Sequence, residues 1–261
     1  MRPERSLRRE VARQREPLHR INPNFRTLQE IVFPDEVLDF RGESVLIHDT
    51  GSEDQYRMLI FSNEQLEAFS RTASIFQIDG TFSKAPKCYN DSANNHGQLY
   101  SIHALVNGIS IPVYYALLKT KRQVDYSRLF TFLRDERNFQ PVAIMSDLET
   151  AVINAVRTIF PDAQHSLCYY HFQEAIFDWL KSHHMAERYG QDQNFRCLVN
   201  MLGGLAFVPQ RFVIDGWMAI NGRIDRIFPD DNDANDLKAY FAPPLLAHLG
   251  KTVPGVIHNF R

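Results

Sequence analysis

The spacing of hydrophobic residues changes several times along the chain, and each change predicts a different element. Short runs rich in Ile, Val, Tyr and Phe predict strands at 75–79, 98–105, 111–118, 142–146 and 165–168. Apolar positions three and four residues apart predict helices at 126–137, 148–159 and 172–183. In the first of these helices, Leu129, Phe130 and Leu133 form the apolar face.

The order of these elements is three strands, then helix, strand, helix, strand and helix. Three successive strands form a meander, whereas strands separated by helices return to the sheet through crossovers. The predicted fold class is therefore α/β, a ribonuclease H-like mixed sheet flanked by helices. Two more helices, at 194–207 and 210–220, predict an additional C-terminal helical insertion.

The N-terminal part is organised differently. Residues 1–26 hold eight arginines and three glutamates. They predict either a basic arm that contacts a phosphate backbone or a solvated helical segment with Glu and Arg interleaved. Short strands at 44–48 and 57–61 and a helix from Ser62 or Asn63 to Ser70 follow. The predicted domains are a basic arm and connector (1–40), lead-in elements (41–73), the ribonuclease H-like core (74–183) and a helical insertion with a truncated C-terminal part (184–261).

Composition narrows the classes of function. The chain has 261 residues, of which 44% are hydrophobic and 23% charged, which is enough for a sizeable core and excludes disorder throughout. No apolar run is long enough for a membrane span, and three cysteines cannot build a disulfide framework, so we expect a soluble intracellular protein. A net charge of −2 gives no overall basic field, so any contact with a polyanion must be local.

Two aspartates stand at the ends of predicted strands. Asp79 ends the first strand of the series and Asp147 follows the fourth. These strands are neighbours in the predicted topology, so the two carboxylates meet at one edge of the sheet. Paired carboxylates suit Mg²⁺ or Mn²⁺, which activates a water or hydroxyl and stabilises the leaving oxygen in phosphoryl transfer. The alternative is that Asp79 and Gly80 form a turn and that Asp147 caps the next helix.

Six strings of residues occur in a fixed order along this part of the chain. They are IDGTF with AP at 78–86, QLYSIH at 98–103, PVYYALL at 112–118, SDLETA at 146–151, FPDA at 160–163 and CYYHF at 168–172. Together they resemble the MULE transposase domain of Mutator-like elements. The resemblance covers about residues 74–180, and residues 195–209 continue in the same manner.

The resemblance implies a ribonuclease H-like recombinase of the DDE type, which cuts DNA and joins ends through two divalent metal ions. Asp79 and Asp147 match its first two acidic positions, so they are the implied metal ligands. The implied cofactor is Mg²⁺ or Mn²⁺, and the implied partners are transposon ends and further copies of the chain in a homo-oligomer. A nuclear location without a membrane partner is also implied.

Cys168 and His171 form the Cys-x-x-His pair that such transposases carry after the second acid. By resemblance the pair has a positional role at the catalytic edge, with His171 facing the metals or the DNA. Two other interpretations are open: a zinc site completed by Cys197 or by the doublet at 183–184, or a packed thiol with the imidazole capping the next helix.

The third acid departs from the family pattern. Residues 237–241 (LKAYF) resemble the context in which the family carries a glutamate, but Ala242 stands at the next position. The remaining candidates are Glu149, Glu174, Asp231, Asp233 and Asp236. Glu174 comes one turn after His171, so we assign it a catalytic role beside the two aspartates and His171. Glu149 is expected to interact with a helix dipole instead.

These observations leave two hypotheses. The first is a transposase catalytic domain, and the second is a catalytically inactive, transposon-derived DNA-binding protein. A missing third ligand would remove most of the activity and favour the second. The C-terminal tail at 251–261 follows soon after the altered acid position, which favours truncation. The loop 87–97, rich in Asn, Asp and Ser, is expected to be solvated.

Overall fold

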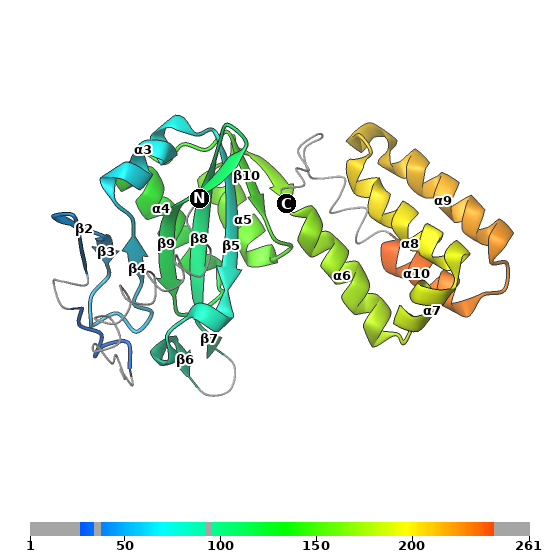
Figure 1. The fold of residues 1–261 in the computed structure, drawn as a ribbon, viewed down its shortest axis with the longest axis horizontal. Helices are drawn as coiled ribbons and strands as arrows, with labels where there is room; N and C mark the ends of the chain where they lie inside the picture. The colour runs from blue at the N-terminus through cyan, green and yellow to red at the C-terminus, as the bar shows by residue number, and fades with distance from the viewer. Residues whose placement is uncertain (1–26, 34–37, 92–94, 243–261) are drawn as a thin grey trace, which may run out of the picture. The chain divides into compact units, whose positions relative to one another are not determined.

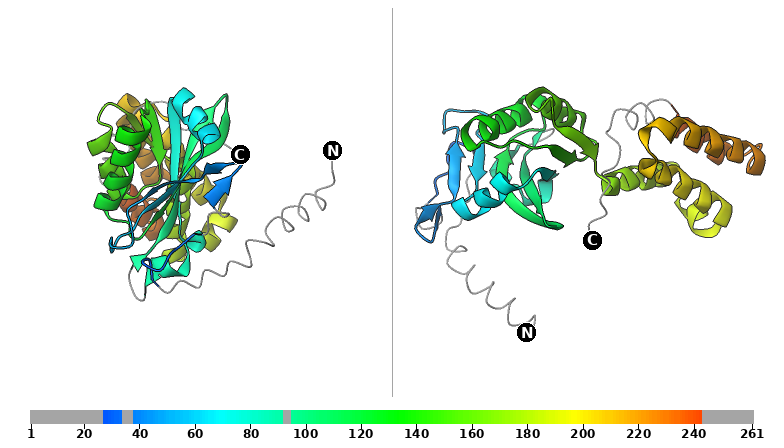
Figure 2. Two further views of the ribbon diagram at one scale, coloured as in Figure 1. Left: turned by 90° about the vertical axis from the view of Figure 1, so that its left-hand side faces the viewer. Right: turned by 90° about the horizontal axis from the view of Figure 1, so that it is seen from above.

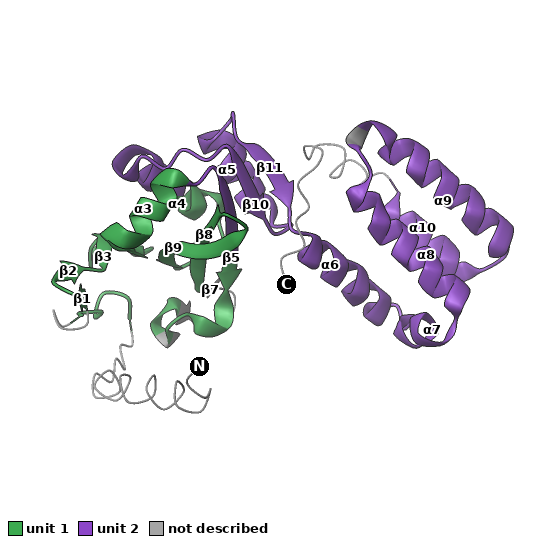
Figure 3. Cartoon of the chain, turned by 45° about the horizontal axis from the view of Figure 1, so that its top comes forward, with its two compact units in different colours: residues 1–72, 80–129 green, residues 73–79, 130–261 purple. Residues whose placement is uncertain are grey.

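The computed structural model describes residues 27–33, 38–91 and 95–242 (Figure 1). The basic arm at 1–26 and the C-terminal tail therefore lie outside the described residues. The chain divides into two units, which are described in turn (Figure 3). Unit 1 holds residues 1–72 and 80–129, and unit 2 holds residues 73–79 and 130–261.

Strands and helices alternate in the second half of the sheet region, after a series of strands. The strands are β1 (Asp39–Phe40), β2 (Glu43–Ser44), β3 (Leu46–Asp49), β4 (Leu59–Phe61), β5 (Ile75–Thr81), β6 (Asn90–Asp91), β7 (Asn95–His96), β8 (Gln98–Val106), β9 (Ile109–Leu118), β10 (Ala143–Ser146) and β11 (Gln164–Leu167). The helices are α3 (Glu64–Thr72), α4 (Gln123–Arg137), α5 (Thr150–Ile159), α6 (Tyr169–Ser182), α7 (Ala186–Gln191), α8 (Gln193–Gly204), α9 (Val213–Ile227) and α10 (Asn232–Phe241). Short 3-10 turns lie at η1 (Phe82–Lys84), η2 (Lys87–Tyr89), η3 (Leu205–Phe207) and η4 (Gln210–Phe212).

The main sheet has seven strands in the order β11-β10-β5-β8-β9-β4-β3. Its parallel pairs are β5 with β10 and β10 with β11, and its antiparallel pairs include β8 with β9, β9 with β4 and β4 with β3. The protein is therefore a mixed α/β fold with a sheet flanked by helices. None of the helices in the described part of the chain is long and apolar enough to cross a membrane.

In unit 1, β8 and β9 form a hairpin that closes at Asn107 and Gly108. Both residues have positive φ, 51° and 79°, as a two-residue Asn-Gly turn requires. The strands pair from Val106 with Ile109 to Gln98 with Leu118. Alternate residues of β8 are buried, which explains the two-residue period of its sequence.

The loop 87–97 is only partly the solvated loop that its composition suggested. Tyr89 in this loop is fully buried and Cys88 is nearly so, among the apolar side chains of Leu59 and Leu117. The Tyr89 ring supplies a large apolar surface to the core, and its hydroxyl donates to the Arg57 carbonyl oxygen at 3.4 Å. The polar residues around Tyr89 along the chain gave no sign that its side chain belongs to the core.

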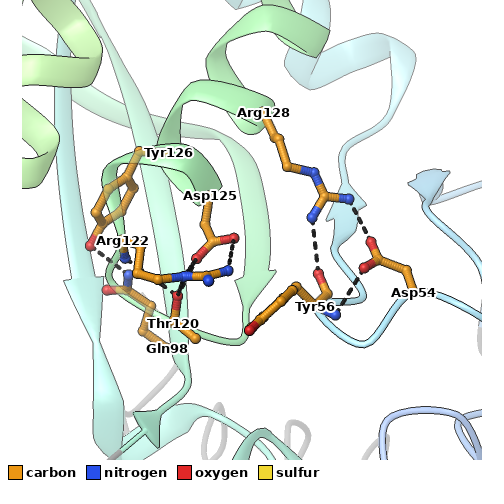
Figure 4. A network of polar contacts seen from close by, with 8 residues as sticks. All are labelled: Asp54, Tyr56, Gln98, Thr120, Arg122, Asp125, Tyr126 and Arg128. Carbon is orange, nitrogen blue, oxygen red and sulfur yellow. Dashed lines mark hydrogen bonds and ion pairs between the residues drawn. The ribbon is translucent and has the colours of Figure 1, made fainter.

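A polar network in unit 1 joins the loop 50–57 to the start of α4 (Figure 4). The Arg128 guanidinium donates to the Asp54 carboxylate and, at 3.4 Å, to the Tyr56 carbonyl oxygen. Arg122 lies over the Tyr56 ring, with its guanidinium carbon 3.8 Å from the ring centroid, and pairs with Asp125. These contacts hold the beginning of α4 in place.

In unit 2, the parallel strands β5, β10 and β11 carry α5 against them. Ala143 of β10 pairs with Ile75 of β5 on one side and with Gln164 of β11 on the other. All four residues of β10 are buried, as expected for a strand between two parallel neighbours. The rings of Phe76 and Phe139 lie 4.4 Å apart between centroids and pack edge to face in this core.

Helices α6 to α10 pack around a second core of unit 2, and they run from yellow-green to orange-red in Figure 2. The Arg188 guanidinium of α7 forms ion pairs with Asp231 and Asp233 and lies over the Phe195 ring at 4.4 Å. Asp231 also caps α10, because its carboxylate accepts a hydrogen bond from the Ala234 N–H at 3.1 Å. The helices are thus joined by charge as well as by apolar packing.

The predicted series of strands and helices from residue 75 to residue 207 is confirmed, with ends that shift by up to three residues. The helix predicted at 210–220 is α9, which ends seven residues later, at Ile227. β5, β8 and β9 are neighbours in order, and β10 lies beside β5, as the predicted topology required. The helix α7 was not predicted, because six residues are too few to show a helical period. Asn63 is confirmed as the cap before α3, since its side-chain oxygen accepts from the Leu66 N–H at 2.9 Å.

Candidate active site

Asp79 lies near the C-terminal end of β5, and Asp147 directly follows β10, its parallel neighbour. The predicted strand end at Asp79 is two residues early, and the alternative of a turn at Asp79 and Gly80 is wrong, because β5 continues to Thr81. Gln77 of β5 pairs with Met145 of β10, and each aspartate comes two residues further along its own segment. Side chains two positions apart on a strand point to the same face, so the register favours both carboxylates on one side of the sheet. The Asp79 side chain is 52% exposed, so its carboxylate is accessible to solvent.

Asp147 is held from two directions where the chain leaves β10. Its carboxylate oxygen Oδ1 accepts a hydrogen bond from the Glu149 N–H at 3.1 Å. Its backbone carbonyl oxygen accepts a hydrogen bond from the Ser146 hydroxyl at 2.8 Å. Both contacts restrict the turn between β10 and α5, and with it the direction of the Asp147 side chain.

His171 reaches this edge from the first turn of α6. Its Nε2 atom lies 4.0 Å from the Asp79 carboxylate oxygen Oδ1. A hydrogen bond with Cys168 raises the pKa of His171 to about 9, against the effect of burial, and the negative charges of Asp79 and Asp147 add to the rise. The two aspartates and His171 therefore interact electrostatically at one place, although they come from three separate elements.

Cys168 ends the loop between β11 and α6 and is the residue that precedes the helix. Its N–H donates to the Ser146 carbonyl oxygen at 2.7 Å, which ties the start of α6 to the end of β10. Burial raises the pKa of the Cys168 thiol, but hydrogen bonds from His171 and from the Tyr170 backbone outweigh it and leave the pKa below its ordinary value. The Cys-x-x-His spacing thus places a polar pair beside the aspartates.

His165 of β11 contacts Ser146, the residue before Asp147, and sequence reasoning assigned it no role. Its ring Nε2 is 2.9 Å from the Ser146 hydroxyl oxygen, and the residue is only 7% exposed. Burial, with a smaller effect from Arg157, lowers the pKa of His165 to about 4, so the ring is neutral at pH 7. A histidine inside the strand that follows the Ser-Asp string is the sequence signal for this contact.

No third carboxylate joins the two aspartates in the part of the chain that the structure describes. Glu174 is exposed on α6, one turn beyond His171, and Glu149 precedes α5. Asp231 and Asp233 are paired with Arg188. The position of the third acid predicted from the sequence therefore stays a prediction.

The zinc interpretation of the Cys-x-x-His pair finds no further ligands. Within residues 27–33, 38–91 and 95–242, no three or more His, Cys, Asp or Glu side chains are grouped so that they could hold a metal ion. Cys197 is exposed on α8, and the doublet at 183–184 follows the far end of α6. These residues do not complete a zinc site with Cys168 and His171.

The order of the strings, the strand topology and the two strand-end aspartates all point to one family, and the comparison with family models agrees. Residues 75–175 match the MULE transposase domain. This MULE segment contains Asp79, Asp147, Cys168, His171 and Glu174. The match indicates a transposase-related role. No curated protein matches the chain.

The MULE match suggests a divalent metal ion, and the donor atoms at this edge fit one. Mg²⁺ prefers oxygen ligands, keeps several waters and is bound in phosphoryl-transfer sites through one or two carboxylates together with substrate phosphates. Asp79 and Asp147 supply two carboxylates from adjacent strand ends. The donor set therefore suits Mg²⁺ or Mn²⁺ rather than zinc, which takes nitrogen and sulfur ligands.

Proposed function

We propose that this chain is a catalytic domain of the Mutator-like transposases, which cuts DNA strands and transfers their ends with the help of divalent metal ions. The observation that carries the proposal is that Asp79 lies near the C-terminal end of β5 and Asp147 directly follows β10, the parallel neighbour of β5, inside the MULE segment. We further propose a ribonuclease H-like fold, because a three-strand meander is followed by crossover strands.

The residues of the site have separate roles in this proposal. Asp79 and Asp147 hold the metal ions, which when bound activate the attacking oxygen and neutralise charge on the phosphodiester. The N-terminus of α6, where Cys168 and His171 hold the first turn, faces a phosphate with the positive end of its helix dipole. Glu174 is the proposed third carboxylate, because it lies on the same helix one turn further along. Transposon ends are the proposed substrate, and the nucleus is the proposed location.

A nicking assay tests the proposal. The full chain is incubated with supercoiled plasmid and Mn²⁺, and the loss of supercoiled DNA is measured. Asp79→Asn and Asp147→Asn should each reduce the nicking rate by about a hundredfold or more, because a lost ligand removes several kcal/mol of charge stabilisation in the transition state. Glu174→Gln should have a comparable effect if Glu174 is the third carboxylate.

The matched control is Asp178→Asn. Asp178 is an exposed carboxylate on α6 whose contact is an ion pair with Lys181 at 2.9 Å, so its loss should leave nicking unchanged. Nicking that persists in both Asp79→Asn and Asp147→Asn would refute the two-metal assignment.

The second candidate function is DNA binding without cleavage. One observation favours it: the acids Asp231 and Asp233, which follow the helical insertion in sequence, are bound to Arg188 and are not grouped with the strand-end aspartates. In that case the chain should retain plasmid in a gel-shift assay and show no Mn²⁺-dependent nicking. Binding and nicking measured on the same sample separate the two functions.

A further inference from the structure

A chain of hydrogen bonds runs from β11 through the end of β10 to the backbone of Asp147. The Ser146 hydroxyl donates to the Asp147 carbonyl oxygen at 2.8 Å, and the same hydroxyl lies 2.9 Å from His165 Nε2. Ser146 is 1% exposed and His165 is 7% exposed, so water does not compete for these contacts. The arrangement is internal to unit 2.

The position of the His165 proton follows from counting the hydrogens in these hydrogen bonds. A serine hydroxyl has one hydrogen, and here the Asp147 carbonyl receives it. Ser146 Oγ must therefore accept from His165, so the His165 proton is on Nε2. The other ring nitrogen, Nδ1, is buried and makes no hydrogen bond in the described part of the chain, which suits a neutral ring with its single proton directed at Ser146.

The strand register makes this contact possible. His165 pairs with Ile144 in the parallel β10–β11 ladder, and Ser146 is two residues further along β10 on the same face as Ile144. The imidazole thus reaches diagonally to the last residue of β10.

We propose that Ser146 and His165 are positioning residues, which fix the peptide between Asp147 and Leu148 and so direct the Asp147 carboxylate toward the metal. The inference rests on the proposed function. The Glu149 N–H holds the carboxylate at Oδ1, while the Ser146 hydroxyl holds the carbonyl of the same residue. Asp147 is thereby restrained at both ends, as outer-shell hydrogen bonds restrain the ligands of other metal sites.

A purely structural role for this pair would have a different signature. Removing one partner leaves a buried polar group unsatisfied and destabilises the fold, whereas replacing both by apolar groups of similar size is nearly neutral for stability. The double variant Ser146→Ala/His165→Leu should therefore be more stable than Ser146→Ala alone. If the pair positions Asp147, the double variant still lacks the hydrogen bond that directs the carboxylate.

The experiment measures Mn²⁺ binding to the full chain by calorimetry. Ser146→Ala and the double variant should both bind Mn²⁺ about tenfold more weakly than the wild type, as expected for the loss of an outer-shell contact. Ser146→Thr keeps a hydroxyl and should bind like the wild type. The matched control is Ser62→Ala in unit 1, which removes another buried hydroxyl donating to a backbone carbonyl, that of Val113 at 2.6 Å. This control should not change binding.

Wild-type affinity in the double variant would overturn the positioning role. If the wild-type chain itself binds no Mn²⁺, the proposed function fails, and the positioning role is then judged by hydrogen exchange of the Glu149 amide measured by NMR. That amide should exchange about tenfold faster in Ser146→Ala and in the double variant, because Asp147 Oδ1 no longer holds it firmly. It should be unchanged in Ser62→Ala. Equal exchange in all variants would reject the positioning role independently of metal binding.

Discussion

At the scale of single residues, two histidines of unit 2 differ in how their surroundings act on the imidazole. His165 is buried beside a serine hydroxyl, so its charged form is disfavoured and its pKa falls to about 4. His171 has the Cys168 thiol and two aspartates around it, so its charged form is favoured and its pKa rises to about 9. Burial alone does not predict the charge of a histidine, since partners decide whether the cost of burial is offset.

The lowered pKa of His165 predicts a dependence of stability on pH. The unfolded chain protonates this histidine near pH 6.5, whereas the folded chain does so only near pH 4. Its contribution is therefore fully present above pH 6.5 and is lost as the pH falls toward 4, by about 3 kcal/mol of unfolding free energy. Urea unfolding at pH 7 and pH 4 should show a smaller pH dependence in His165→Leu than in the wild type.

The control for this prediction is His184→Asn. His184 is exposed and has a φ of 59°, a conformation that asparagine tolerates, so the substitution should keep the wild-type pH dependence. Equal pH dependence in His165→Leu and the wild type would mean that His165 is not held neutral in the folded chain.

At the scale of elements, Gly80, the residue after Asp79, packs closely against β8 within unit 1. A Cβ at this position would lie 2.1 Å from Gln98 Oε1 and 3.3 Å from Tyr100 Cδ2. Gln98 cannot move aside easily, because it is buried and its amide donates to the Tyr126 hydroxyl at 2.6 Å (Figure 4). Glycine here serves close packing rather than a positive φ.

Gly80→Ala should therefore destabilise the protein by about 1–3 kcal/mol, as overpacking in a rigid core does. It should also lower Mn²⁺ affinity, because the strain falls next to Asp79. The measurements are thermal unfolding and calorimetry. The matched control is Gly222→Ala on α9, where a Cβ meets nothing within 4 Å, so helix propensity should stabilise that variant by up to about 1 kcal/mol. A Gly80→Ala protein as stable as the wild type would show that Gln98 yields.

At the scale of the whole molecule, α6 contacts both the sheet part of unit 2 and the core formed with helices α7 to α10. Its first turn carries His171 beside the strand-end aspartates, while Phe172 and the rest of its buried face join the core of α7 to α10. Phe241 at the end of α10 packs edge to face on Phe172, with ring centroids 6.4 Å apart. Helices α7 to α10 thus pack against the helix that carries His171.

Phe241→Ala should destabilise unit 2 by about 3–5 kcal/mol, because Phe241 is fully buried and its removal leaves a cavity. Hydrogen exchange measured by mass spectrometry should rise along α6 as well as α10. Met218→Ala on α9 is the control, since Met218 is 63% exposed and its truncation should change stability by less than about 0.5 kcal/mol. Unchanged exchange along α6 would mean that the helical core and the site helix unfold independently.

The order of elements and the two aspartates were predictable because both depend on local patterns. β5 begins with alternating burial, β10 is a short buried run and α5 has a helical period. Asp79 lies near the end of β5, and Asp147 directly follows β10. The burial of Tyr89 was not predictable, because its neighbours in sequence are polar and its contacts come from distant strands. The ion pairs of Arg188 with α10 are hidden for the same reason, since more than forty positions separate the partners.

The sequence by itself determined the series of strands and helices, the MULE segment and the aspartates at two strand ends, because period and short motifs act over a few residues. Only the tertiary structure decided that β5 and β10 pair in register, that His171 faces Asp79, and that His165 reaches Ser146. These relations depend on distances between segments far apart in the chain. Such distances follow from the packing of the whole sheet, which no local pattern encodes.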